Sequence, residues 1–92
     1  MYYTCILSSK RNGTLYIGVT NNLRRRVREH RLHSKLSFTQ RYDVVQLMYW
    51  EEFTYIQDAI AREKQLKRWN RAWKIRLIRS KNPGWHDLFD EL

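Results

Sequence analysis

The stretch "TLYIGV", residues 14–19, has the β-branched and aromatic side chains that are typical of a strand. A similar run, "YYTCIL", occupies residues 2–7, and Asn12-Gly13 between the two runs is a turn signal that hairpins favour. The pattern therefore predicts an antiparallel β-hairpin. Gly18 interrupts the second strand, which predicts either a bulge or the close approach of another group to the backbone.

The segment after the hairpin predicts a helix and then a third strand. Leu23, Val27 and His30 recur at helical spacing, and Asn21 or Asn22 is a suitable N-cap. The run "VVQLMYW", residues 44–50, follows as the third strand.

From residue 54 onward the apolar residues recur with a helical period for about 25 residues. A break near Trp69 or Asn70 predicts two helices, and "NPGW" at residues 82–85 ends the region. The tail is expected to form one helical turn that docks on the body through Trp85, Leu88 and Phe89.

The order β-β-α-β-α-α predicts an α+β fold, an α/β sandwich in which helices flank a small three-stranded antiparallel sheet. Ninety-two residues are too few for two independent cores, so residues 1–92 are expected to form a single domain.

The chain is strongly basic, with 18 Lys and Arg against nine Asp and Glu and a formal charge of +9. Fourteen of the 18 basic residues fall in two predicted helical segments, residues 24–31 and 62–81. This distribution favours a nucleic acid as partner. No run approaches the roughly 18 apolar residues that a membrane span needs, so a membrane partner is not expected.

Cys5 is the one cysteine and cannot form an internal disulfide. No charged leader followed by an apolar stretch precedes the first strand, and we therefore expect a cytoplasmic protein.

Glu63 contradicts the apolar pattern of its helix. It follows Ala59 and Ile60 and precedes Leu66 at helical spacing, which places a carboxylate on the inward face. Such a carboxylate is costly unless it is paired or binds a metal. The alternative is that Glu63 lies at the boundary of the apolar face and pairs with Arg62, Lys67 or a basic residue on the first helix.

Arg26 and His30 lie along the inward edge of the first predicted helix. Arg26 faces the sheet by this pattern and is suited to clamping a phosphate, although one more solvated arginine is the simpler interpretation. His30 is suited to proton transfer or to a structural role, and Tyr16 is suited to the site or to packing.

Taken together, "YYTCIL", "LYIGVTNNLRRRVREH", "AREKQLKRW" and "NPGW" resemble the GIY-YIG nuclease superfamily, most closely its small stand-alone bacterial branch. The resemblance spans Tyr2 to about Leu88. It implies a DNA endonuclease that hydrolyses phosphodiester bonds with one divalent metal, Mg²⁺ or Mn²⁺.

Site roles follow from the resemblance, position by position. Tyr16 and Gly18 resemble the YIG tyrosine and glycine, and Arg26 the family arginine. Glu63 resembles the metal-binding glutamate, while His30 matches a position near the scissile phosphate.

Other residues are expected to contact the substrate. Asn82 resembles the polar residue that often closes the site. Arg25, Lys67 and Arg71 are the basic side chains expected to bind DNA phosphates.

Cys5 departs from the family, because it stands where the first motif has a tyrosine. Tyr3 lies on the same strand face and is a possible substitute. A thiol has a lower reference pKa than a phenol, so we expect easier ionisation at this position. Activity is then reduced, lost or carried by Tyr16.

The form of the substrate is less marked in the sequence. Lys and Arg attract phosphates without reading bases, and four Trp are available to stack unpaired bases, although Trp in so small a domain is often core. We expect single-stranded or branched DNA. The alternatives are a nucleic-acid-binding module without catalysis and a structural protein that assembles on RNA, and the oligomeric state is open.

Overall fold

The computed structural model describes residues 1–9, 13–36 and 45–92, with the side chains of residues 33–36 left out. Residues 10–12 and 37–44 are not described, so Asn12 of the predicted turn and the first residue of the predicted third strand lie outside the described residues. No helix among the described residues is long and apolar enough to cross a membrane.

Three strands form one antiparallel sheet, as predicted, and their order in the sheet is β2-β1-β3. The strands are β1 (Tyr2–Ser8), β2 (Leu15–Thr20) and β3 (Gln46–Phe53). In the β1–β2 hairpin Cys5 pairs with Gly18, and the register runs without a shift from Tyr3 to Ser8. The bulge suggested for Gly18 is therefore absent, and the irregularity lies instead between β1 and β3, at Ile6/Leu7.

Polar caps set where the helices begin. Helix α1 (Leu23–Leu36) begins after Asn22, whose side-chain Oδ1 accepts a hydrogen bond from the Arg25 backbone N–H. Helices α2 (Ile56–Arg68) and α3 (Arg71–Lys81) are separate, and Asn70 caps α3 by accepting from the Trp73 N–H. Both the predicted N-cap and the predicted break are confirmed, because the asparagine side chains satisfy backbone donors that a continuous helix would not expose.

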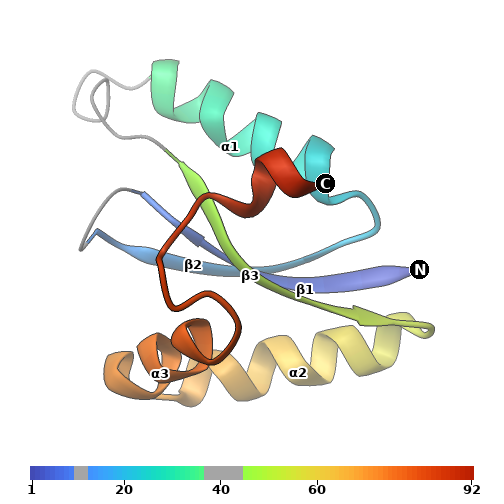
Figure 1. Ribbon diagram of the computed structural model, residues 1–92. Helices are drawn as coiled ribbons and strands as arrows, with labels where there is room; N and C mark the ends of the chain where they lie inside the picture. Colours follow the sequence, from blue (N-terminus) through green and yellow to red (C-terminus); the bar gives the residue numbers. More distant parts are fainter. Residues whose placement is uncertain (10–12, 37–44) are drawn as a thin grey trace.

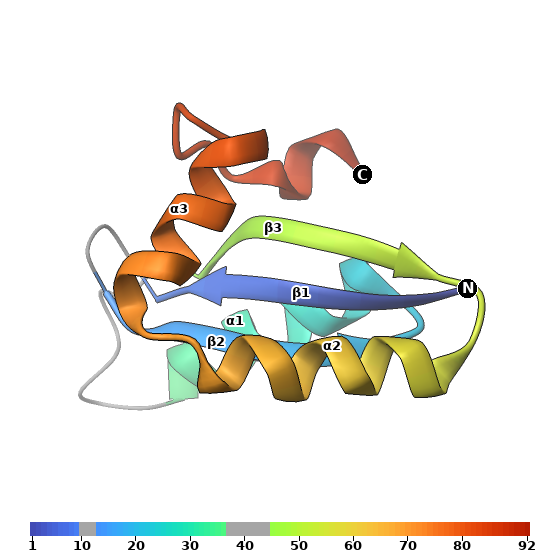
Figure 2. The ribbon, with the colours of Figure 1, turned by 90° about the horizontal axis from the view of Figure 1, so that it is seen from below.

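The sheet has helices on both faces (Figure 1). Helix α1 and the short 3₁₀ helix η2 (Leu88–Glu91) cover one face, and α2 and α3 cover the other. Figure 2 shows α2 and α3 at an angle, with α3 directed toward β3; correspondingly, α2 contacts mainly β1 and β2, whereas α3 contacts β3.

Each face of the sheet has its own core because side chains alternate along a strand. The α1 face buries Cys5, Leu7, Leu23, Val27, Val45 and Leu47. The α2–α3 face buries Ile6, Met48, Tyr49, Leu66 and Ile78. The tail docks as predicted, with Leu88 and Phe89 on the first core and Trp85 on the second.

Candidate functional site

Gly18 lies beneath the side chain of Arg26. A Cβ atom at position 18 would lie 3.4 Å from Arg26 Nη2 and 3.7 Å from its Nε, so a methyl group would touch the guanidinium and a larger side chain would collide with it. The φ angle of Gly18 is not positive, and the strand backbone itself does not require glycine. The predicted close approach is thus confirmed, and the approaching group is an arginine on the first turns of α1.

The Nε–H of Arg26 is buried and has no hydrogen-bond partner among the described residues. Buried donors are nearly always paired, and an unpaired charged donor costs more than a neutral one. A guanidinium held in this state against bare backbone is suited to an anion that brings its own acceptors.

Cys5 lies across from Gly18 in the hairpin and is buried. Burial raises the pKa of its thiol to about 11, against the opposing effects of the Arg26 charge and a hydrogen bond from the Gly18 backbone. The expectation of easy ionisation is wrong, because it used the reference pKa of a solvated thiol. At neutral pH the thiol is protonated and cannot act as a base.

Glu63 acts on the same thiol from the other layer of the molecule. Its charge on α2 raises the pKa of Cys5 while that of Arg26 on α1 lowers it, so both charges lie within electrostatic reach of one atom although they belong to helices on opposite faces of the sheet. The Glu63 side chain is 20% exposed, and its Oε2 lies 3.6 Å from Lys67 Nζ. Lys67 is therefore the partner it takes, and Arg62 is not.

Tyr16 and His30 lie next to each other over the α1 face of the sheet. Their ring centroids are 5.7 Å apart, with the planes inclined by 48°. Tyr16 is partly buried against the core that contains Cys5. A phenol and an imidazole thus meet beside Gly18, on the element pair that also positions Arg26.

Tyr3 packs against the same core but is directed to another neighbour. Its ring makes an edge contact with Trp50, at 5.9 Å between centroids. The shared strand face with Cys5 is as predicted, and the phenol also serves as packing for β3.

Asn82 is not brought to this site. It caps the C-terminal end of α3, is 3% exposed, and donates from Nδ2 to the backbone oxygens of Met48 and His86 while its Oδ1 accepts from the His86 N–H. These bonds tie it to β3, which β1 separates from the strand that carries Gly18. Its hydrogen-bonding groups are used by the fold, so the expected role in closing the site has no support here.

The three basic residues expected to bind DNA are exposed but differ in place. Arg25 donates to Asn21 Oδ1 and pairs with Glu29 on α1. Lys67 lies beside Glu63. Arg71 donates to the Gly13 backbone oxygen, near the turn between β1 and β2 and away from the start of α1.

Only a loosely coordinated metal fits this donor set. The described residues contain no group of three or more His, Cys, Asp or Glu side chains that could hold an ion. Mg²⁺ commonly takes one or two carboxylates and completes its shell with water and substrate phosphates. Glu63, a partly exposed carboxylate on α2, fits that requirement, whereas a closed structural site does not.

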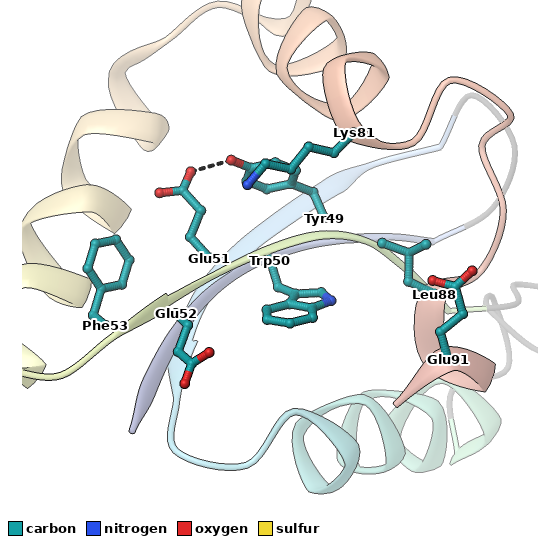
Figure 3. A pocket seen from close by; sticks show the side chains of 8 residues that line it. All are labelled: Tyr49, Trp50, Glu51, Glu52, Phe53, Lys81, Leu88 and Glu91. Carbon is teal, nitrogen blue, oxygen red and sulfur yellow. Dashed lines mark hydrogen bonds between the residues drawn. The ribbon is translucent and has the colours of Figure 1, made fainter.

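A second polar cluster, on β3, was missed by the sequence reasoning. The Tyr49 hydroxyl donates to Glu51 (Figure 3). Arg62 Nε donates to both Glu51 carboxylate oxygens at 3.1–3.2 Å. Burial and the Glu51 acceptor raise the pKa of Tyr49. The i, i+2 spacing of Tyr49 and Glu51 on a strand was the available signal, but the Arg62 partner comes from another element.

Comparison with known proteins identifies the family of the chain. A model of the GIY-YIG catalytic domain matches residues 1–76. A UPF0213 protein of Clostridium perfringens is 37% identical over 82 residues, which cover 89% of this chain and 87% of that protein. A UPF0213 protein of Natronomonas pharaonis is 36% identical over 77 residues, covering 84% of this chain and 89% of the relative.

A solved structure has the same fold. The solution NMR structure of a UPF0213 protein from Bacillus halodurans superposes with a TM-score of 0.59 at 23% identity, covering 94% of this chain and 90% of that one.

Proposed function

Because the chain belongs to the GIY-YIG catalytic domain family, we propose that it is a divalent-metal-dependent endonuclease that hydrolyses phosphodiester bonds in DNA, with single-stranded or branched DNA preferred. The observation that carries the proposal is the buried Nε–H of Arg26 over Gly18, which has no hydrogen-bond partner among residues 1–9, 13–36 and 45–92 as described. A phosphate is the anion that a DNA-binding site would supply to it.

Arg26 binds the phosphate and stabilises its charge in this mechanism. Its planar guanidinium offers several donors to two phosphate oxygens at once. Charge accumulates on these oxygens as water attacks phosphorus, so the interaction strengthens in the transition state. The absence of a side chain at Gly18 leaves room for both the guanidinium and the incoming backbone.

Tyr16 and His30 accept the proton of the attacking water in this mechanism. The attacking water forms a bond to phosphorus as the bond from phosphorus to the 3′ oxygen breaks, and the water's proton passes to His30 through the Tyr16 hydroxyl. Their adjacency, with 5.7 Å between ring centroids, supports this pairing of roles. The leaving 3′ oxygen takes its proton from solvent.

Glu63 is the residue that would hold Mg²⁺ or Mn²⁺. When bound, such an ion supplies positive charge to the phosphate and to the leaving oxygen. In this proposal Glu63 contributes its carboxylate from α2 and Arg26 its guanidinium from α1, and these helices cover opposite faces of the sheet.

The test is cleavage of labelled single-stranded, duplex and flapped DNA with Mg²⁺ or Mn²⁺, using the parent chain, Arg26→Ala and Glu63→Ala. We expect either substitution to lower the cleavage rate at least about 100-fold. Glu29→Ala is the matched control, because Glu29 is an exposed carboxylate on α1 paired with Arg25. Equal cleavage by all four proteins would remove this site assignment.

A second candidate function, a DNA-binding module without catalysis, is favoured by Cys5, which is a protonated thiol at the family's first tyrosine position. Cys5→Tyr and Cys5→Phe separate the two, since both enlarge the side chain and only one adds a phenol. We expect Cys5→Tyr to cleave faster than Cys5→Phe. Metal-independent binding with no cleavage by the parent or by Cys5→Tyr would support the binding module.

A further inference from the structure

A groove of about 370 Å³ lies along α3, next to Trp69 in the connection between α2 and α3, and apart from Gly18 and Arg26. It is lined by Trp69, Trp73, Arg76, Leu77 and Ser80, and we call it the tryptophan groove. The endonuclease mechanism uses none of these residues.

Trp73 presents an aromatic surface to solvent in this groove. Its side chain lies in the first turn of α3, close to the end of α2. It is 51% exposed, which is a large apolar area for this position. Trp69 lies beneath it in an edge contact, with 5.9 Å between centroids and an interplanar angle of 85°. The Arg62 guanidinium covers Trp69 at 5.2 Å and is itself fixed by Glu51, so the support for Trp73 is rigid.

The surroundings of the groove are cationic. Helix α3 carries Arg71, Lys74, Arg76, Arg79 and Lys81 and no acidic residue. The adjoining end of α2 adds Lys67 and Arg68. An exposed ring beside the cations of α3, a helix that has no acidic residue of its own, favours a ligand that is both aromatic and anionic.

We propose that the tryptophan groove binds an unpaired base of single-stranded DNA, with the base stacked on Trp73 and the flanking phosphates held by Arg76 and its neighbours on α3. The inference deepens the proposed function and rests on it for DNA as the polymer. Bases within a duplex have both faces stacked on their neighbours, so the groove selects unpaired strands. Aromatic side chains among basic residues are the usual means of binding single strands without reading sequence.

The experiment measures binding of fluorescently labelled oligo-dT and of a matched duplex, in EDTA so that no cleavage occurs. The proteins are the full chain, Trp73→Ala, Trp73→Phe and Tyr55→Ala. Tyr55 is the control, because it is also an exposed aromatic residue, at 65%, but lies at the other end of α2 next to Asp58.

We expect Trp73→Ala to bind oligo-dT roughly 5- to 100-fold more weakly, since loss of one stacking platform has that effect. Trp73→Phe should retain most of the affinity, and Tyr55→Ala should bind as the parent does. Duplex binding should not change by more than about twofold in any variant. A circular dichroism melt of Trp73→Ala checks that the chain is folded.

Unchanged oligo-dT binding by folded Trp73→Ala would overturn the proposal, as would an equal loss on duplex. A shift from dimer to monomer in Trp73→Ala, with single-strand affinity unaltered, would assign the groove to a second copy of the chain. The outcomes separate this inference from the proposed function. If Trp73→Ala loses single-strand affinity but Glu63→Ala changes no cleavage, the groove stands and the endonuclease falls; the opposite pair of results removes the groove alone.

Discussion

Charged groups at the two edges of the sheet, β2 and β3, differ in their hydrogen-bond partners. At β3, Glu51 accepts from Arg62 and Tyr49, and Asp87 accepts from Arg31 at 2.5 Å. At β2, the Arg26 Nε–H is buried and has no partner within the part of the chain that the structure describes. Ionic groups that are paired within the chain hold elements together. A buried donor that the fold does not pair is available to an acceptor on a ligand. The difference separates the part of the molecule that builds the fold from the part that meets a ligand.

Arg26→Lys is the sharpest way to break this contrast. A lysine keeps the charge but loses the planar pair of donors, so we expect cleavage to fall at least about 100-fold while the free energy of unfolding changes by less than about 1 kcal/mol. Arg28→Lys, on the exposed side of α1, is the matched control. Cleavage and urea unfolding of both variants provide the measurement, and a large loss of stability in Arg26→Lys would mean that the guanidinium serves the fold.

Gly18 offers a graded test of the same contact. An alanine Cβ would lie 3.4 Å from Arg26 Nη2, which is an ordinary van der Waals contact, whereas a valine must displace the guanidinium. We expect Gly18→Ala to retain most activity and Gly18→Val to lose about 10- to 100-fold, because small misplacements of a positioning group have large effects on rate. Equal rates for Ala and Val would show that the position of Arg26 over Gly18 does not matter for cleavage.

Asp87 tests the β3 side of the comparison. Its carboxylate accepts from the backbone N–H groups of Leu47 and Phe89 as well as from Arg31, and so fastens the tail and α1 to β3. We expect Asp87→Ala to lower the free energy of unfolding by about 2 kcal/mol, since it leaves these partly buried donors unpaired. Urea unfolding measures this, and the cleavage rate per folded molecule should stay within about twofold of the parent.

The difference between the edges also explains what could be read from the sequence. The hairpin, the Asn22 cap and the break between α2 and α3 depend on local turn chemistry and on periods of two and 3.6 residues, which are visible in one chain. Arg26 facing the sheet and the inward bias of Glu63 were visible for the same reason.

What could not be predicted involves partners from distant elements. Arg31 and Asp87 are 56 residues apart, and the Asn82 side chain binds the Met48 backbone, so no periodicity reveals either contact. The thiol of Cys5 was misjudged because its pKa depends on burial, which is a tertiary property. Family resemblance placed Asn82 in the site, but its amide is used to hold α3 to β3.

The smallest expected effect is on the pH dependence of stability at Cys5. This residue lies on β1, between the β2 edge and the β3 edge of the sheet. Its pKa rises from 9.0 to about 11 on folding, so the folded protein holds this proton more tightly than the unfolded chain. The stability that this group contributes is complete below about pH 9 and is lost as the pH rises toward 11. Comparing urea unfolding of the parent and Cys5→Ala from pH 8 to 11, we expect the parent's free energy of unfolding to fall more steeply, by up to about 2 kcal/mol.

The Cys5→Ala comparison isolates the contribution of the thiol. Tyr49 also has a raised pKa, so its ionisation at high pH lowers the free energy of unfolding equally in both proteins. Parallel curves for parent and variant would mean that Cys5 is solvated in the native state. Water near Cys5 would then be available to accept the Arg26 Nε–H. This donor would no longer be evidence for a phosphate-binding site.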